Sequence, residues 1–102
     1  MVRIHLEFGG GMELLFGNAR ELVTDIPPEM PGSTVNVGQA LEHIRANVLV
    51  DKARSDMFMK GSTIRPGVLV LINDADWELS GLEESELEDG DKLAFISTLH
   101  GG

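Results

Sequence analysis

The chain has 102 residues and no cysteine, which indicates one domain and excludes disulfides, thiolate catalysis and cysteine-bound metals. Its 17 acidic and 8 basic residues give a formal net charge of -9. Direct binding to nucleic acid or to a membrane surface is therefore not expected, because both need basic residues. The acidity either suits a partner with a basic face or serves only to keep the domain soluble.

The chain lacks an apolar segment of membrane-spanning length. Its longest apolar run covers residues 68–72, whereas a bilayer needs roughly 20 residues. Arg3, His5 and Glu7 interrupt the apolar residues at the N-terminus, where a signal peptide would have its core. We expect a soluble intracellular monomer, located in the cytoplasm alone or in the cytoplasm and the nucleus.

The N-terminal third predicts a β-hairpin. Apolar and polar residues alternate through residues 2–8, which is typical of a strand with one face on the core. Three glycines follow, and the apolar residues 12–16 then predict the second strand of the hairpin. Residues 17–33 contain three prolines and are predicted to be mainly loop, with room for a short strand at residues 22–23.

One helix is predicted, beginning near Asn36. Asn36 can accept a hydrogen bond at the helix start, and Gln39 completes a pair that resembles a capping box. An apolar stripe with spacings of three and four residues follows, formed by Val37, Ala40, Leu41, Ile44 and Val48. The helix is expected to end between residues 47 and 52 and to pack its stripe on a sheet.

The C-terminal half predicts three more strands. The uninterrupted apolar run at residues 68–72 suits a central strand covered on both faces. A turn separates it from a short strand at residues 77–79, and the acidic residues 83–88 predict one helical turn. The last strand is placed at residues 92–96.

The order of these elements indicates an α+β fold, with one main helix packed across a mixed sheet. Residues 1–97 are assigned to the domain and residues 98–102 to a flexible C-terminal tail.

A conventional active site is not evident in the sequence. The three histidines His5, His43 and His100 are far apart and lack the spacing of a zinc pair, so we predict no metal. We expect His5 and His43 to be solvated.

Trp77 is predicted to pack in the domain rather than to anchor an interface. The run of Met57, Phe58 and Met59 is predicted to join the core.

The last two residues, Gly101 and Gly102, offer the most distinctive chemistry. Glycine has no Cβ, so such a tail can thread a narrow channel and present a terminal carboxylate unshielded. A carboxylate is a poor electrophile, but a mixed anhydride with AMP has a good leaving group. Attack by sulfur then gives a thiocarboxylate and attack by an amine gives an amide. This chemistry needs no catalytic side chain from the carrier.

Three blocks of the chain resemble the ubiquitin-related modifier family, which is the eukaryotic branch of ubiquitin-like sulfur carriers. They are residues 7–16, which contain the three glycines, residues 62–79, which contain Arg-Pro-Gly and Asn-Asp-Ala-Asp-Trp-Glu-Leu, and residues 95–102, which end in Leu-His-Gly-Gly. The resemblance covers most of the chain and is weakest in residues 17–34. It implies a β-grasp fold.

The resemblance also implies two activities. An activating enzyme with a rhodanese-like domain would use ATP to adenylate Gly102 and convert it to a thiocarboxylate. The sulfur would pass to a tRNA thiolase complex for 2-thiolation of wobble uridine. In addition, Gly102 would be linked covalently to lysines of target proteins. The carrier itself would be neither an enzyme nor a cofactor-binding protein.

Within the tail, the resemblance assigns distinct roles to four residues. Gly102 would carry the reactive carbonyl, and Gly101 would supply clearance. Leu99 and His100 would lie along the partner's channel, His100 either as a recognised residue or as a spacer.

Three alternatives remain open at this stage. The chain could be a modifier that never carries sulfur, or a carrier of the molybdopterin-synthase or thiamin type. It could also be a non-covalent binding domain with an incidental glycine tail.

Overall fold

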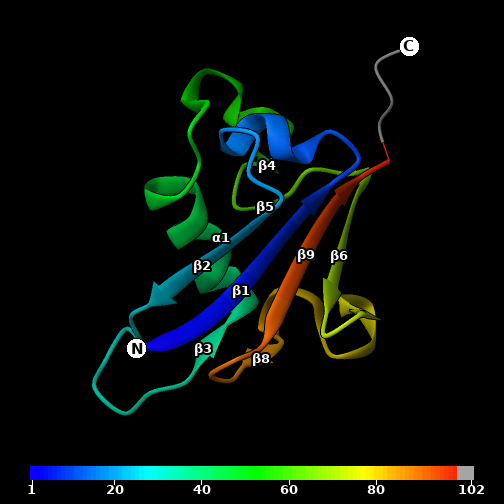
Figure 1. The fold of residues 1–102 in the computed structure, drawn as a ribbon. Coiled ribbons are helices and arrows are strands. Elements are labelled where there is room, and N and C mark those ends of the chain that lie inside the picture. Colours follow the sequence, from blue (N-terminus) through cyan, green and yellow to red (C-terminus); the bar gives the residue numbers. More distant parts are fainter. Residues whose placement is uncertain (99–102) are drawn as a thin grey trace.

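The computed structural model describes residues 1–98, which form a five-stranded mixed sheet with one α-helix across one face (Figure 1). The strands of the sheet lie in the order β2-β1-β9-β6-β7. Among the described helices, none is long and apolar enough to cross a membrane. The elements are β1 (Val2–Gly9), η1 (Met12–Phe16), β2 (Glu21–Ile26), β3 (Val35–Asn36), α1 (Val37–Asn47), η2 (Lys52–Met57), β4 (Met59–Lys60), β5 (Thr63–Ile64), β6 (Val68–Ile72), β7 (Ala75–Asp76), η3 (Trp77–Leu79), η4 (Leu82–Glu84), β8 (Glu86–Leu87) and β9 (Lys92–Ser97).

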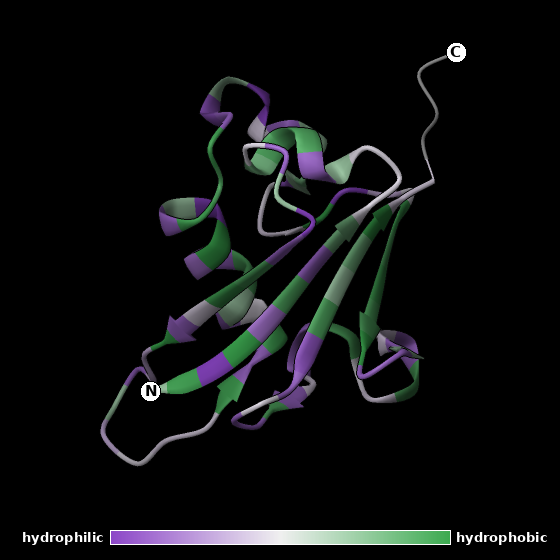
Figure 2. Ribbon diagram, in the orientation of Figure 1, coloured by the Kyte–Doolittle hydropathy of each residue, from purple (hydrophilic) through white to green (hydrophobic). Residues whose placement is uncertain are grey.

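The predicted α+β architecture with a mixed sheet is confirmed. Strands β1 and β9 pair in parallel, with Phe8 opposite Phe95, whereas the neighbouring pairs β1–β2 and β9–β6 are antiparallel. Hydrophobic and hydrophilic bands alternate along β1, and β6 is hydrophobic throughout (Figure 2). The alternation places one set of β1 side chains on the core and the other on the face opposite α1.

Helix α1 begins as its sequence predicts. The side chain of Asn36 accepts a hydrogen bond from the N–H of Gln39 at 2.9 Å, and Gln39 Oε1 accepts one from the N–H of Asn36 at 2.8 Å. This reciprocal capping box satisfies two donors that a helix start leaves unpaired. The predicted stripe packs on the sheet: Val37, Ala40, Leu41 and Ile44 are fully buried, and Val48 is partly buried.

All four phenylalanines meet in one cluster inside the domain. Phe8 stacks on Phe16 with ring centroids 3.9 Å apart, and Phe58 meets the edges of Phe16 and Phe95 at 5.4 and 5.3 Å. Such edge and stacked pairs stabilise a core by about 0.5–1.5 kcal/mol each beyond area burial. The cluster ties η1 and η2, both outside the sheet, to the strands that carry the C-terminus.

The predicted hairpin is wrong in its second strand. Residues 12–16 form the 3-10 helix η1, flanked by Gly11 and Gly17, which both have left-handed backbone conformations. Its buried residues are Met12, Leu15 and Phe16, a spacing that buries one side of a helical turn rather than one face of a strand. Strand β2 pairs with β1 instead, and it extends well beyond the short strand predicted at residues 22–23.

Two further details of the C-terminal half differ from the predictions. Residues 77–79 form the 3-10 helix η3 and not a strand, because Asp76 caps it by accepting a hydrogen bond from the N–H of Glu78 at 2.9 Å. The helical turn predicted in residues 83–88 is present as the short helix η4, but the later residues of this stretch form strand β8, which pairs with β3.

Strand β6 occupies the predicted position but is covered on one face only. Val70 is fully buried on the side of α1, whereas Leu69 on the other side is 37% exposed. Trp77 is buried as predicted, with 8% of its surface exposed. Phe58 and Met59 join the core as predicted, whereas Met57, at 40% exposed, does not.

Candidate functional site at the root of the C-terminal tail

Of the predicted tail, residues 98–102, the four residues with assigned roles, Leu99, His100, Gly101 and Gly102, lie outside the described residues. The structure instead describes the two residues that lead into them, Ser97 and Thr98, which are called the tail root below. Strand β9 ends at Ser97. The geometry of the tail root therefore determines where the last four residues of the chain start.

The tail root is held by strands on both sides. On one side Gly9 of β1 lies opposite Ile96, and on the other Val68 of β6 lies opposite Ser97. Beyond the strand, the carbonyl oxygen of Gly67 accepts a hydrogen bond from the N–H of Thr98 at 2.9 Å and another from the Thr98 hydroxyl. The chain thus leaves the domain from a defined position.

Gly10 forms the second contact of the tail root. Its backbone has φ +65°, and a Cβ built on it would lie 2.1 Å from the carbonyl oxygen of Ser97. No side chain fits at that distance, so this turn requires glycine for both space and conformation. Gly67 likewise has a left-handed backbone, with φ 97°. Two turns that are distant in sequence therefore flank the tail root, each with a glycine.

The sequence interpretation did not connect these glycines with the tail. It assigned residues 9–11 to a hairpin turn and Gly67 to a separate turn. The only available signal was the run of three glycines, which is more than a hairpin needs. The pairing with Ser97 depends on β1 and β9 being parallel neighbours, and that is a property of the tertiary fold.

An apolar surface lies beside the tail root, on the sheet face opposite α1. It is formed by Leu69, which is 37% exposed, with the half-buried Ile96 opposite it and the half-buried Leu71 beside it, and is called the open-face patch below. Their neighbours in the strands, such as Val70 and Phe95, point into the core. A shallow groove lined by Gly9, Arg20, Glu21 and others borders the patch. This face offers a partner an apolar contact that is continuous with the tail root.

The charges are distributed unevenly between the two ends of the sheet. Residues 74–91 contain nine carboxylates and no lysine or arginine. They lie near the start of β9, whereas the tail root is at the other end of this strand. Residues 45–65 carry five of the eight basic residues and only two acidic ones. The acidic segment is therefore remote from the tail root, and a partner with a basic face would be attracted to a different part of the domain.

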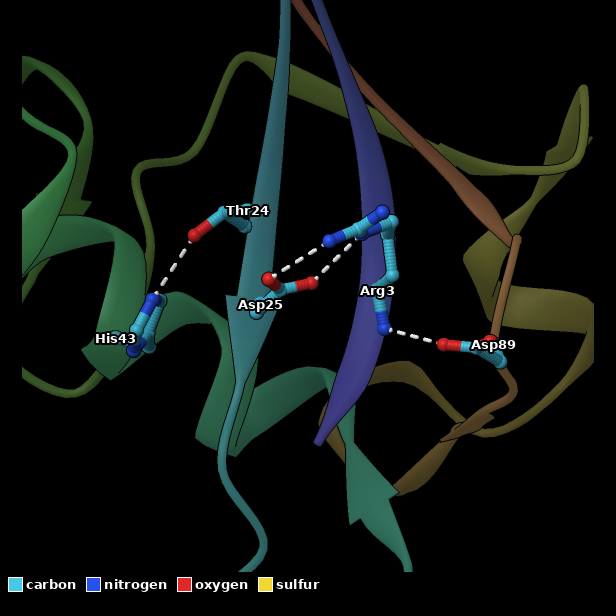
Figure 3. Close-up of polar contacts among 5 residues, drawn as sticks. All are labelled: Arg3, Thr24, Asp25, His43 and Asp89. Atoms are coloured by element: carbon cyan, nitrogen blue, oxygen red, sulfur yellow. Dashed lines mark hydrogen bonds and ion pairs between the residues drawn. The ribbon is translucent and has the colours of Figure 1, made fainter.

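Ion pairs lie on the same face of the sheet, and Glu7 of one pair lines the groove that borders the patch. Arg3 Nε lies 2.9 Å from Asp25 Oδ1, and the Arg3 N–H donates to Asp89 Oδ1 at 2.7 Å (Figure 3). The hydrogen bond from Arg3 lowers the pKa of Asp25 and raises the pKa of Arg3. Lys92 Nζ lies 2.8 Å from Asp74 and 3.7 Å from Glu7, and the hydrogen bond to Asp74 raises the pKa of Lys92.

The two described histidines are placed differently. His5 is exposed on the open face as predicted, whereas His43 is half-buried and its Nε2 lies 3.0 Å from Thr24 Oγ1, joining α1 to β2 (Figure 3). The prediction that His43 is solvated is therefore wrong in part. Within residues 1–98, no three metal-ligating side chains cluster, and the absence of a metal stays a prediction for the whole chain.

This combination of a mixed sheet, a helix across one face and a fixed tail root defines a ubiquitin-like β-grasp domain. The solution structure of Urm1 from Trypanosoma brucei superimposes with a TM-score of 0.75 at 36% identity, covering 98% of this chain and 95% of that one. The crystal structure of SAMP1 from Haloferax volcanii gives a TM-score of 0.72, and at 18% identity it supports the fold alone; 98% of this chain and 99% of that one are covered.

Comparison of the sequence identifies the family. The family model described as Urm1 (Ubiquitin related modifier) matches residues 3–102. The "Ubiquitin-related modifier 1 homolog" of Chlamydomonas reinhardtii is 50% identical over 102 residues, which is 100% of each chain. The "Ubiquitin-related modifier 1 homolog 1" of Arabidopsis thaliana is 47% identical over 103 residues, covering 99% of this chain and 100% of that one. The chain belongs to the Urm1 family of ubiquitin-like modifiers and sulfur carriers.

Proposed function

We propose that this protein carries sulfur as a thiocarboxylate on Gly102 and is also attached through Gly102 to lysines of target proteins. Family membership supports the proposal. The observation that carries it is the geometry of the tail root, where Gly10 and Gly67 hold Ser97 and Thr98 directly before the last four residues. A domain whose only task is to present its last residue needs a rigid base for it, and the tail root is such a base.

The reaction proceeds on a partner enzyme. Attack of the Gly102 carboxylate on ATP forms an acyl adenylate and releases pyrophosphate. A persulfide sulfur of a rhodanese-like domain then attacks the carbonyl and AMP leaves. Reductive cleavage of the resulting acyl disulfide by a thiol leaves the thiocarboxylate. ATP is bound by the enzyme, and the carrier supplies only the acyl group and its placement.

Two products of this activation are proposed. In the first, a tRNA thiolase complex takes the sulfur for 2-thiouridine at wobble positions, so that the acidic carrier reaches tRNA through enzymes. In the second, a target lysine attacks the activated carbonyl and an isopeptide bond forms. Within the tail, Gly101 gives clearance in the enzyme channel, and Leu99 and His100 lie along it. These reactions are proposed for the cytoplasm.

We further propose that the activating enzyme docks on the open-face patch. Leu69, which is 37% exposed, and its half-buried partner Ile96 form an apolar pair directly before the tail root. A partner seated there is placed to receive the tail without any rearrangement of the domain. Burial of apolar surface contributes about 25 cal/mol per Å² to such an association.

Mass spectrometry of the full chain tests the proposal. After incubation with ATP, a Urm1-activating enzyme and a persulfide donor, we expect a gain of about 16 Da from the exchange of oxygen for sulfur. A variant that lacks Gly102 is the control and should not change mass. An intact chain that is adenylated without gaining sulfur would support the modifier that carries no sulfur, and the carrier proposal would be rejected.

A further inference from the structure

The three lysines of the chain, Lys52, Lys60 and Lys92, are its only side-chain amines, and the structure places them in different environments. An amine must be free of its hydrogen-bond acceptors and must lose a proton before it can attack an acyl group. Lysines whose amines are hydrogen-bonded to carbonyls or carboxylates are therefore poor nucleophiles toward an acyl group. This criterion separates the three residues.

Lys52 and Lys92 are both engaged within the domain. The Nζ of Lys52 donates to the carbonyl oxygens of Arg45 and Ala46, the latter at 2.9 Å, and so satisfies acceptors that the end of α1 leaves unpaired. The Nζ of Lys92 lies between Asp74 and Glu7, and its side chain is 30% exposed. The hydrogen bond to Asp74 raises the pKa of Lys92, so the neutral, nucleophilic fraction of this amine is smaller than that of an unpaired lysine.

Lys60 differs from both. Like Lys52 it is exposed, at the end of β4 and directly before the two-residue turn of the β4–β5 hairpin, but unlike Lys52 and Lys92 its ammonium makes no hydrogen bond or ion pair with residues 1–98. The turn residue Gly61 has open space around it and accepts a hydrogen bond from Arg45 Nη1 at 2.8 Å. The hairpin is therefore anchored to α1, while the exposed Lys60 amine is left without a hydrogen-bond partner among residues 1–98.

We infer that Lys60 is the acceptor lysine by which one copy of this chain is linked to Gly102 of a second copy. The inference rests on the proposed function, because it needs an activated Gly102 acyl group. The neutral Lys60 amine attacks the carbonyl carbon of the Gly102 acyl adenylate, a C–N bond forms, and the C–O bond to AMP breaks. AMP leaves with the electron pair, and the attacking nitrogen loses one proton to water. The product is an isopeptide-linked dimer.

The first test measures the availability of each amine. The full chain, with its N-terminal amine blocked by acetylation, is treated with limiting N-acetoxysuccinimide, and the acetylation rate of each lysine is followed by mass spectrometry. We expect Lys60 to react roughly tenfold faster than Lys52 and Lys92, because a charge-assisted hydrogen bond must break at each of the latter. Equal rates at the three lysines, or a faster reaction at Lys52 or Lys92, would overturn the inference.

The second test forms the linkage itself. An N-acetylated donor chain that carries K52R, K60R and K92R together and a C-terminal thioester on Gly102 is mixed with N-acetylated acceptor chains that are unchanged or carry K60R, K52R or K92R. The donor has no free amine of its own, so each linked dimer reports on the acceptor. We expect the K60R acceptor to lose most of the linked dimer and the K52R and K92R acceptors to retain it. Dimer that persists with K60R, or linkage mapped to another lysine, would overturn the inference.

This design keeps the inference separate from the proposed function. The thioester is made chemically, so the test needs neither ATP nor the activating enzyme. Failure of the enzymatic mass gain would refute the sulfur-carrier proposal and leave the relative acceptor strength of the lysines as measured. Circular dichroism of the three arginine variants checks that each is folded, and arginine preserves the positive charge that Lys52 and Lys92 use within the domain.

Discussion

The carbonyl oxygen of Gly67 accepts two hydrogen bonds from Thr98, one from the backbone N–H at 2.9 Å and one from the side-chain hydroxyl. Gly67 closes the turn before β6, and Thr98 is the first residue after β9. The two bonds therefore extend the pairing of β6 and β9 by one residue and fix the direction in which the chain leaves the sheet. Four testable consequences of this site and its surroundings follow.

Removal of the Thr98 hydroxyl should loosen the tail root without unfolding the domain. In the T98V variant we expect the free energy of unfolding to fall by about 1 kcal/mol or less, since one exposed hydrogen bond is lost. The Thr98 amide should exchange its hydrogen faster, as followed by NMR. The T98S variant retains a hydroxyl and should exchange at the original rate; equal acceleration in both variants would mean that the hydroxyl does not contribute.

Substitution of Gly10 should be far more damaging than substitution of its neighbour Gly11. Both residues have positive φ, so alanine costs roughly 1–2 kcal/mol at either position. At Gly10 the new Cβ would also lie 2.1 Å from the Ser97 carbonyl oxygen, whereas at Gly11 no atom lies within 4 Å. In urea unfolding we expect G10A to lose more stability than G11A by about 1–3 kcal/mol, the usual cost of overpacking. Equal losses would show that the Gly10–Ser97 contact does not constrain the chain.

A charge placed on the open-face patch should impair activation. The L69E variant introduces a carboxylate into the apolar pair formed by Leu69 and Ile96, which we propose to be covered by the activating enzyme. We expect weaker binding to the enzyme, by roughly tenfold or more, because burying an unpaired charge costs more than 1.4 kcal/mol. The matched control is L79E, at a leucine that is 82% exposed on η3. Equal effects of the two variants would place the docking surface elsewhere.

The ion pair between Arg3 and Asp25 should make stability depend on pH in the acid range. The hydrogen bond from Arg3 lowers the pKa of the Asp25 carboxyl in the folded chain. The ion pair therefore contributes fully to the free energy of unfolding above the pKa that the Asp25 carboxyl has in the unfolded chain, about 4. This contribution is lost as the pH falls through the lower pKa that the carboxyl has in the folded chain. The stability difference between the unchanged chain and D25N should be largest near neutral pH and should shrink in acid.

Urea unfolding between pH 2 and pH 7 at low salt measures this difference. Both side chains are exposed, so added salt should reduce it further. A difference that stays constant from pH 7 down to pH 2 would exclude the ionised Asp25 as its source.

The elements that could be predicted from sequence are those with a strong local pattern. Helix α1 has both a capping pair and an apolar stripe, and β1 and β9 have strand patterns, so their positions are confirmed. Residues 12–16 are apolar in a way that suits a strand or a short helix, and the burial of Met12, Leu15 and Phe16 against the rest of the domain is visible only in the structure. The face of β6 that carries Leu69 was expected to be covered because an apolar run does not reveal how many layers a domain has.

The candidate site could be predicted only in part. The Gly-Gly ending is visible in the sequence, and the role proposed for it needs no catalytic side chain. The residues that position it are Gly10 and Gly67, which lie 87 and 31 residues before Ser97 and Thr98, and no local pattern links them. A contact between a turn and a strand end is set by strand order, which depends on the energetics of the whole sheet.

The parallel pairing of β1 with β9 has a consequence for biosynthesis. Strand β9, which leads into the tail, lies between β1 and β6. The centre of the sheet can therefore form only after almost the whole chain has been synthesised. A nascent or misfolded molecule has no assembled open face and no ordered exit for its last residues. An enzyme that must bind both the open face and the residues after β9 would therefore activate folded, full-length copies and not unfinished ones.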